Sequence, residues 1–271
     1  MAMKIKSAAE IAVLRENAEI LQGILQRLAE EARAGVTTLQ LDQLAERLIS
    51  EADGRPSFKG YRVRGRIYPA NICTSVNAEV VHGIPRADRI LRAGDVLSID
   101  IGMMRRGFCA DLATTVIIED EPRSPRERNV VLTAQEALWE GINAARGGNR
   151  VGDISHAIQQ YVNSRGLSVV TNFVGHGIGR EMHEEPQVPN YGAAGQGPLL
   201  REGLVICIEP MVADSNRDLI ELEEQEDGWT AVAPGATVAA HFEAMVVIRE
   251  HAPPDVLGMG IFERVGLPVQ R

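Results

Sequence analysis

The chain has 271 residues, of which 45% are hydrophobic and 24% are charged, a composition typical of a soluble globular protein. A net charge of −9, without any block of lysine and arginine, argues against a nucleic-acid-binding protein. No run of about 18 apolar residues occurs, so no membrane span is expected. The three cysteines, Cys73, Cys109 and Cys207, are widely spaced, which predicts reduced, buried thiols in a cytoplasmic protein.

The N-terminal part of the chain contains two predicted amphipathic helices. Ser7 and Glu10 have the spacing of a capping box, and apolar residues at helical intervals then continue to about Ala34. Thr37 and Gln40 repeat the capping-box spacing and begin a second helix with its own apolar face. A helical hairpin is therefore expected before the first β-rich segment.

A second pair of helices is predicted in the middle of the chain. Ser124 and Pro125 have the residue types preferred at the N-cap and first helical positions, and this helix is expected to end near Gly147. Asp153 is the predicted N-cap of a further helix that ends near Gly166. A second β-rich segment follows these two helices.

The two β-rich segments resemble each other. Leu91–Asp100 aligns without a gap on Leu200–Glu209, and leucine, arginine, glycine and isoleucine recur at matching positions. Upstream, the tetrapeptide HGIP at 82–85 echoes HEEP at 183–186. We interpret this as an internal duplication. The expected architecture is an α+β fold in one domain, residues 1–271, with ααββ halves at about 7–118 and 124–250 related by a pseudo-twofold axis.

Two strands are predicted over 96–102 and 108–118, where valine, isoleucine and threonine are frequent. A two-residue turn at Arg105–Arg106 would place Asp100 directly opposite Asp111 on one face of the hairpin. Two like charges among apolar neighbours are destabilising unless a cation lies between them. The pair therefore indicates a metal site.

The second half repeats this arrangement of carboxylates. Glu209 follows the apolar segment 204–208, and Glu243 precedes the apolar segment 245–248. One aspartate on a strand is usually a surface charge, but four carboxylates at related places in two halves predict convergence on two divalent metals. The acidic run at 221–227 differs, and is expected to be a solvated loop.

Histidines supply the remaining candidate ligands. His176 lies between Gly175 and Gly177, which allow a close approach of the backbone. His183 follows in the same loop, and His82 occupies the related place in the first half; either could be an acid, a hydrogen-bond donor or a second metal ligand. A phosphate-binding loop is the competing interpretation of the glycine pattern, but the strand-to-helix context of such loops is missing.

These motifs resemble those of the type I methionine aminopeptidases, which have the pita-bread fold. The resemblance extends from the first helix to about Val247, and its most specific stretches are Asn77–Pro85, the pair Asp100 and Asp111, Gly175–Arg180, His183–Val188 and Ile208–Val212. It implies a hydrolase that removes the N-terminal methionine from peptides and nascent proteins whose second residue is small. A cytoplasmic monomer that meets nascent chains, with the ribosome as a candidate partner, is also implied.

The resemblance further implies the roles of individual residues. Two divalent metal ions, drawn from Co, Mn, Fe or Zn, would be held by Asp100, Asp111, His176, Glu209 and Glu243, with Asp111 and Glu243 shared by both. A water activated by these metals would attack the peptide bond, and Glu209 would transfer protons. His183 would hydrogen-bond the scissile carbonyl, and His82 would position the substrate amide.

The methionine pocket is implied in the same way. Tyr68 and Cys73 would form its wall, with Tyr61, Met182 and Trp229 as further lining residues. An insertion separates Tyr61 from Tyr68 relative to the family pattern.

Two other positions also depart from that pattern. Val81 replaces a common cysteine, and around the last ligand the chain reads Ala240-His241-Phe242-Glu243-Ala244, where relatives commonly have glutamine before the aromatic residue and histidine after the glutamate. The imidazole of His241 so close to Glu243 is expected to affect metal preference or the bonding around the ligands.

Two alternative functions are compatible with the same motifs. An aminopeptidase P or prolidase-like enzyme would usually carry a large N-terminal domain, and its sequence tends to lack the Glu209-Pro210-Met211 tripeptide. A non-catalytic binding protein of the same fold would normally lose ligands, whereas all five are present here.

Overall fold

The structure is a computed structural model, and it describes residues 3–215 and 217–258. The predicted pairs of helices are confirmed, as are the capping boxes at Ser7 and Thr37. Both α1 and α3 end a few residues before the predicted positions. The helices are α1 (Ala8–Glu31), α2 (Thr38–Glu51), α3 (Pro125–Ala144) and α4 (Val151–Ser164), with a 3-10 turn η1 (Ile118–Asp120).

The prediction that Asp153 is the N-cap of α4 is wrong. The N-cap is Arg150, and Asp153 lies in the first turn, where its Oδ2 accepts a hydrogen bond of 2.7 Å from the Arg150 N–H. Tertiary contacts explain the earlier start: the Val151 N–H donates to the carbonyl oxygen of Pro198 at 3.0 Å. The backbone before Asp153 is therefore satisfied by a loop distant in sequence, which a local capping pattern does not reveal.

The strands form antiparallel sheets, with one parallel pair, β8 (Ser168–Val170) and β13 (Leu219–Ile220), among the described residues. The first sheet joins β1 (Arg55–Pro56), β4 (Ile72–Val76), β6 (Val96–Arg105) and β7 (Phe108–Ile117). The second has the order β10 (Glu184–Val188), β9 (Gly175–Gly177), β11 (Val205–Ile208), β17 (Ala244–Val247) and β18 (Asp255–Leu257). The third has the order β13 (Leu219–Ile220), β8 (Ser168–Val170), β12 (Met211–Ala213) and β16 (Ala239–His241). Smaller sheets join β14 (Glu223–Glu224), β15 (Ala231–Val232) and β5 (Glu79–Val81), and β2 (Arg62–Val63) with β3 (Arg66–Ile67).

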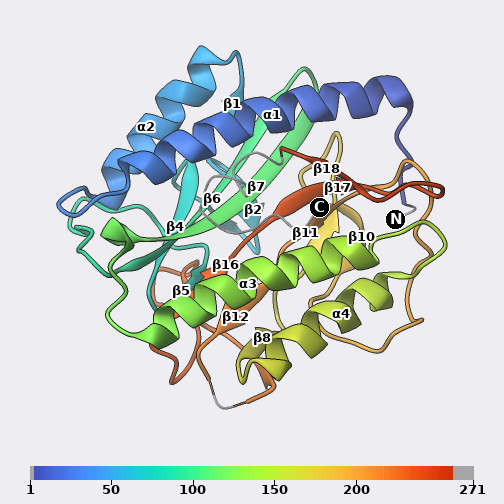
Figure 1. The fold of residues 1–271 in the computed structure, drawn as a ribbon. Coiled ribbons are helices and arrows are strands. Elements are labelled where there is room, and N and C mark those ends of the chain that lie inside the picture. The colour runs from blue at the N-terminus through green and yellow to red at the C-terminus, as the bar shows by residue number, and fades with distance from the viewer. Residues whose placement is uncertain (1–2, 216, 259–271) are drawn as a thin grey trace.

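Helices from the two halves cover the sheets. In Figure 1, α1 crosses the upper part of the molecule and α3 with α4 the lower part, with β6, β7, β16 and β17 drawn between them. The apolar stripe of α1, which includes Leu14, Leu21 and Leu25, is fully buried, and this helix packs on β6 and β7. The α+β class with antiparallel sheets covered by helices is thus confirmed. None of the helices in the two described ranges is long and apolar enough to cross a membrane.

The predicted register of the β6–β7 hairpin is wrong by two residues, because the turn lies one residue further along the chain. The turn is formed by Arg106 and Gly107, both with positive φ, so Asp111 pairs with Gly102 and Asp100 pairs with Ala113. Glycine tolerates the left-handed conformation that a tight hairpin turn requires, which favours this turn over one at Arg105–Arg106. The two aspartates are therefore diagonal neighbours rather than directly opposed. They still share one face, because side chains alternate with a period of two residues.

A backbone contact joins the two halves where the carboxylates lie. The Glu243 N–H donates to the Ala113 carbonyl oxygen at 3.0 Å, which connects β7 to the segment before β17. On the other side, β11 pairs with β17 up to Ile208 and Ala244, one residue short of Glu209 and Glu243. The ends of two hairpins thus meet, and bring their carboxylates together. The acidic run at 221–227 is solvated as expected, except that Glu223–Glu224 forms the short strand β14.

Candidate metal centre

A cavity of about 760 Å³ opens where the sheets meet. Its walls contain all five predicted metal ligands and all but one of the other predicted site residues. The predicted residues that line it are Asp100, Asp111, His176, Glu209, Glu243, His82, His183, Tyr61, Tyr68, Cys73 and Trp229. Residues from segments that are far apart in the sequence therefore share one site.

His176 is at the centre of the carboxylate cluster. Its Nε2 lies 3.7 Å from Asp111 Oδ2, 3.6 Å from Glu209 Oε1 and 3.9 Å from Glu243 Oε1. The His176 Nδ1 is 3.0 Å from the Gly177 carbonyl oxygen. That contact places the proton on Nδ1 and leaves the Nε2 lone pair directed at the cluster, as a metal-binding imidazole requires.

Burial dominates the electrostatics of the cluster. It raises the pKa of Asp100 to about 7, with a further contribution from the charge of Glu243. The pKa values of Asp111, Glu209 and Glu243 are raised well above the usual range by burial and then by neighbouring carboxylates. Burial lowers the pKa of His176 to about 3, so its imidazole is neutral. The centre disfavours accumulated negative charge and contains neutral nitrogen donors, which is the environment that a bound cation relieves.

Hydrogen bonding supports the same interpretation. Asp100 Oδ1, Asp111 Oδ1 and Glu243 Oε1 are buried without a protein hydrogen-bond partner among the described residues. Unpartnered buried oxygens cost about 1–3 kcal/mol each, so such a concentration at one point needs an explanation. Their carboxylate and imidazole neighbours form a donor set that suits divalent first-row metals. The residues present therefore fit a metal centre.

The glycines beside His176 are required by close packing of β9. A methyl group on Gly175 would lie 2.4 Å from the Cys207 carbonyl oxygen, and one on Gly177 would lie 2.3 Å from that of Glu185. Both distances are shorter than van der Waals contact, so only glycine fits between the neighbouring strands. The predicted close approach of the backbone is confirmed. It holds His176 between β10 and β11 with its side chain on the cavity face.

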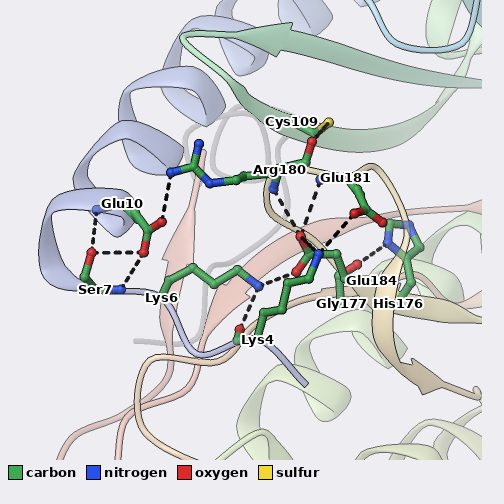
Figure 2. Close-up of polar contacts among 10 residues, drawn as sticks. All are labelled: Lys4, Lys6, Ser7, Glu10, Cys109, His176, Gly177, Arg180, Glu181 and Glu184. Carbon is green, nitrogen blue, oxygen red and sulfur yellow. Dashed lines mark hydrogen bonds and ion pairs between the residues drawn. The ribbon is translucent and has the colours of Figure 1, made fainter. Parts of the chain in front are cut away.

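A polar network behind His176 holds its loop against the N-terminal segment (Figure 2). Lys6 Nζ and Glu184 Oε2 are 2.8 Å apart, and both side chains are almost fully buried. Glu184 Oε1 also accepts a 3.1 Å hydrogen bond from the Arg180 N–H. The Cys109 N–H of β7 donates to the Gly179 carbonyl oxygen at 2.7 Å. The segment that carries His176 and His183 is thus fixed to the N-terminal segment and to the first half.

His183 and His82 lie on the cavity wall. The ring centroids of His183 and His176 are 4.3 Å apart, and the Tyr61 hydroxyl lies 2.7 Å from His183 Nδ1. His82 packs edge-on against Phe173 with a centroid separation of 4.9 Å. His82 has a φ of 60°, which a non-glycine residue rarely adopts and which is common at functional sites. Both histidines thus line the cavity that contains the carboxylate cluster.

The residues expected to form a methionine pocket line the cavity, with one exception. The rings of Tyr68 and Trp229 meet edge to face at 5.2 Å, and Cys73 packs beside them. Tyr61 lies on the same wall despite the insertion that follows it. Met182, however, does not line the cavity among the described residues. Its terminal methyl group packs on Gly102 of β6, and the residue is buried.

Two further residues lie within ligand distance of the cluster. Cys207 groups with Asp111, His176 and Glu243, and His241 groups with Glu209 and Glu243. The sequence predicts Cys207 only as a buried thiol, although its position on β11, two residues before Glu209, could have indicated a shared face. Burial raises its pKa well above the usual range, so the thiol is protonated.

Comparison with known proteins gives the family. The chain matches metallopeptidase family M24 over residues 12–250. It is 43% identical to the methionine aminopeptidase of Clostridium acetobutylicum over 92% of this chain and 96% of the relative. It is 40% identical to methionine aminopeptidase 1 of Bacillus subtilis over 90% and 95% of the two chains.

Comparison with solved structures gives the same family. A methionine aminopeptidase from Thermotoga maritima superposes with a TM-score of 0.88 at 35% identity, over 95% of this chain and 99% of that chain. The prolidase from Pyrococcus furiosus has a TM-score of 0.72 at 21% identity; this chain covers 65% of it, and the likeness shows a shared fold alone. By sequence and structure together, the chain belongs to metallopeptidase family M24 and, within it, to the methionine aminopeptidases.

Proposed function

We propose that this protein removes the N-terminal methionine from peptides and nascent proteins that have a small second residue. The observation that carries the proposal is the convergence of four carboxylates and His176 on a cavity that also contains an aromatic and thiol-lined wall. A metal centre beside an apolar subsite is the arrangement needed to bind an unbranched side chain and hydrolyse the bond after it.

Five residues would hold two divalent metals, with cobalt, manganese, iron or zinc as the candidate ions. We assign as ligands Asp100, Asp111, His176, Glu209 and Glu243, all of which line the cavity. When bound, such metals activate water as a nucleophile near neutral pH and polarise the carbonyl under attack. The unpartnered oxygens and the neutral His176 support this ligand set.

Protein groups around the metals would complete the reaction. Glu209, which borders the cavity, would accept the proton of the attacking water and pass it to the leaving amine. Tyr61 can donate its hydroxyl proton to His183 Nδ1, which keeps the other imidazole proton on Nε2. That Nε2–H would donate to the scissile carbonyl and to the oxyanion that it becomes. His82, whose pKa is lowered to about 4 by burial and neighbouring histidines, would bind the substrate amide in its neutral form.

Specificity would come from the shape of the cavity. The aromatic pair Tyr68 and Trp229, together with Cys73, offers a soft apolar surface that suits a thioether. His82 and His183 border the position of the cleaved bond, so a bulky second residue would displace its carbonyl group. A displacement of about 1 Å can cost a hundredfold in rate, which favours glycine, alanine or serine at that position.

The wider setting follows from this activity. The enzyme would act on the exposed ends of nascent chains, with the ribosome as a candidate partner, in the cytoplasm and as a monomer. Its single catalytic domain would span residues 1–271, with pseudo-halves at about 7–118 and 124–250. The two pairs of helices, each followed by strands, support that division.

Peptide hydrolysis with controlled metal content tests the proposal. Chelator-treated protein should be inactive, and Mn, Fe(II) or Co should restore cleavage of Met-Ala-Ser but little cleavage of Met-Lys-Ser. Asp111→Ala should lose most of the activity in every metal. Full activity after removal of metal would refute the metal mechanism. Cleavage of Ala-Pro-Ala without release of methionine from Met-Ala-Ser would instead favour an aminopeptidase P.

A further inference from the structure

His241 is a buried imidazole that faces the carboxylate cluster. His241 is the last residue of β16, is only 2% exposed, and lines the cavity. Its backbone is held firmly: the His241 N–H donates to Thr115 Oγ1 at 3.0 Å, and the Thr115 hydroxyl donates to the His241 carbonyl oxygen at 2.7 Å. The direction of the side chain is therefore set by the junction of β16 with β7.

Neither nitrogen of the His241 ring has a hydrogen-bond partner among the described residues. A buried polar group without a partner costs about 1–3 kcal/mol, so the imidazole needs one. His176 differs in this respect, because its Nδ1 contacts the Gly177 carbonyl oxygen. A neutral imidazole has one nitrogen with a free lone pair, which is what a metal ligand requires.

The two oxygens of Glu209 lie between two imidazoles. Glu209 Oε1 is 3.6 Å from His176 Nε2, and Glu209 Oε2 is 3.6 Å from His241 Nε2. These distances exceed the range of about 2.7–3.2 Å for a hydrogen bond. Metal–ligand bonds of about 2.0–2.2 Å at angles of 110–120° place two ligand atoms of one metal about 3.4–3.6 Å apart. The separation thus fits shared coordination better than direct hydrogen bonding.

We propose that His241 is a sixth protein ligand, which binds through Nε2 a metal that Glu209 and Glu243 also hold. Its ligand atoms and those of these two glutamates lie within 4.8 Å of one another. Each oxygen of Glu209 would then face a metal that also has an imidazole ligand. This inference rests on the metal site of the proposed function, and goes beyond it by adding a second nitrogen donor.

Metal preference should change as a consequence. Imidazole suits Fe, Co, Ni and Zn, whereas manganese and magnesium favour sites made of oxygen. A centre with both His176 and His241 is therefore expected to select the nitrogen-preferring ions over Mn more strongly than a centre with one imidazole. His241→Gln, which replaces the ring by a weaker neutral donor, should reduce that selectivity.

Proton NMR of the whole protein loaded with Co(II) tests the assignment directly. Each cobalt-bound imidazole gives a hyperfine-shifted N–H resonance, so the unmodified protein should show two and His241→Gln should show one. Calorimetric titration of the metal-stripped protein with Co(II) should give two binding steps, one of them weakened more than about tenfold by His241→Gln. His183→Gln is the matched control, because it removes a cavity imidazole that is not in the ligand group and should leave both readouts unchanged.

The opposing outcomes are distinct. One imidazole resonance in the unmodified protein, or unchanged spectra and affinities in His241→Gln, would overturn the role of His241. Neither result would contradict the proposed release of methionine from Met-Ala-Ser. Failure of the unmodified protein to bind any metal would instead contradict the proposed function. Should His241→Gln fold poorly, the count of resonances in the unmodified protein still decides, and His241→Asn provides a smaller substitution.

Discussion

Asp100→Asn should make the metal-free protein more stable. The same substitution should reduce the stability that the protein gains when it binds metal. Burial, and then the charge of Glu243, raises the pKa of Asp100 from its usual 3.8 to about 7. Between these pH values the unfolded chain is ionised at this position while the folded protein retains the proton. The free energy of unfolding of the metal-free protein therefore falls as pH rises from about 4 to 7, and the whole cost is present above that range.

The size of the effect follows from the shift. Each unit of pKa corresponds to about 1.4 kcal/mol, so about three units amount to about 4 kcal/mol above pH 7. Water in the cavity screens part of this cost, and we expect about 2–4 kcal/mol. Asparagine is neutral at every pH and removes the penalty, so the advantage of metal-free Asp100→Asn should grow by about 1–3 kcal/mol between pH 5 and 8.

Metal should reverse the order of the two proteins. A metal at a thousandfold its dissociation constant stabilises the folded state by about 4 kcal/mol, and the variant, which lacks one ligand, should gain less. Denaturant unfolding with EDTA or with Co(II), at pH 5 and pH 8, measures both differences. Asp88→Asn removes an exposed aspartate away from the cavity and is the control. The reasoning fails if metal-free Asp100→Asn is no more stable than the unmodified protein at pH 8.

Three further predictions concern one buried contact outside the cavity and two residues of its walls. Asp42→Ala should lower the free energy of unfolding by about 3–5 kcal/mol. The Asp42 side chain accepts hydrogen bonds from the backbone and side-chain nitrogens of Asn71 at 2.7 and 2.8 Å, and both nitrogens would be left unpaired. An unchanged midpoint of denaturant unfolding would contradict this. Tyr61→Phe should lower kcat for Met-Ala-Ser roughly fivefold, because one hydrogen bond to His183 is worth about 1 kcal/mol. An unchanged kcat in steady-state kinetics would show that the Tyr61 hydroxyl does not orient the His183 ring. Trp229→Ala should reduce kcat/KM for methionine peptides about 5–150-fold, because about 1–3 kcal/mol of apolar contact with the methionine side chain is lost. Metal affinity, measured by calorimetry, should stay constant. A loss of metal binding would instead show that Trp229 supports the metal site.

Features that depend on neighbouring residues in the chain could be predicted from the sequence. The capping boxes at Ser7 and Thr37 form as their spacing predicts, because each involves residues only three apart. The placement of Asp100 and Asp111 on one face also survived a wrong register, since both the predicted and observed pairings keep the same two-residue alternation. The start of α4 was not predictable in this way, because a loop distant in the sequence satisfies the backbone before Asp153.

The sequence by itself determined the donor set: the carboxylates and His176 were recognisable from their residue types, their apolar surroundings and their repetition in two halves. Only the tertiary structure decided which donors meet. It packed Met182 on Gly102, outside the cavity lining among the described residues, and brought Cys207 and His241 within ligand distance of Glu243. Ligand geometry depends on distances of a few ångströms between segments that are a hundred residues apart. Such distances are set by how sheets pack and where their strands end, and neither is encoded in local patterns.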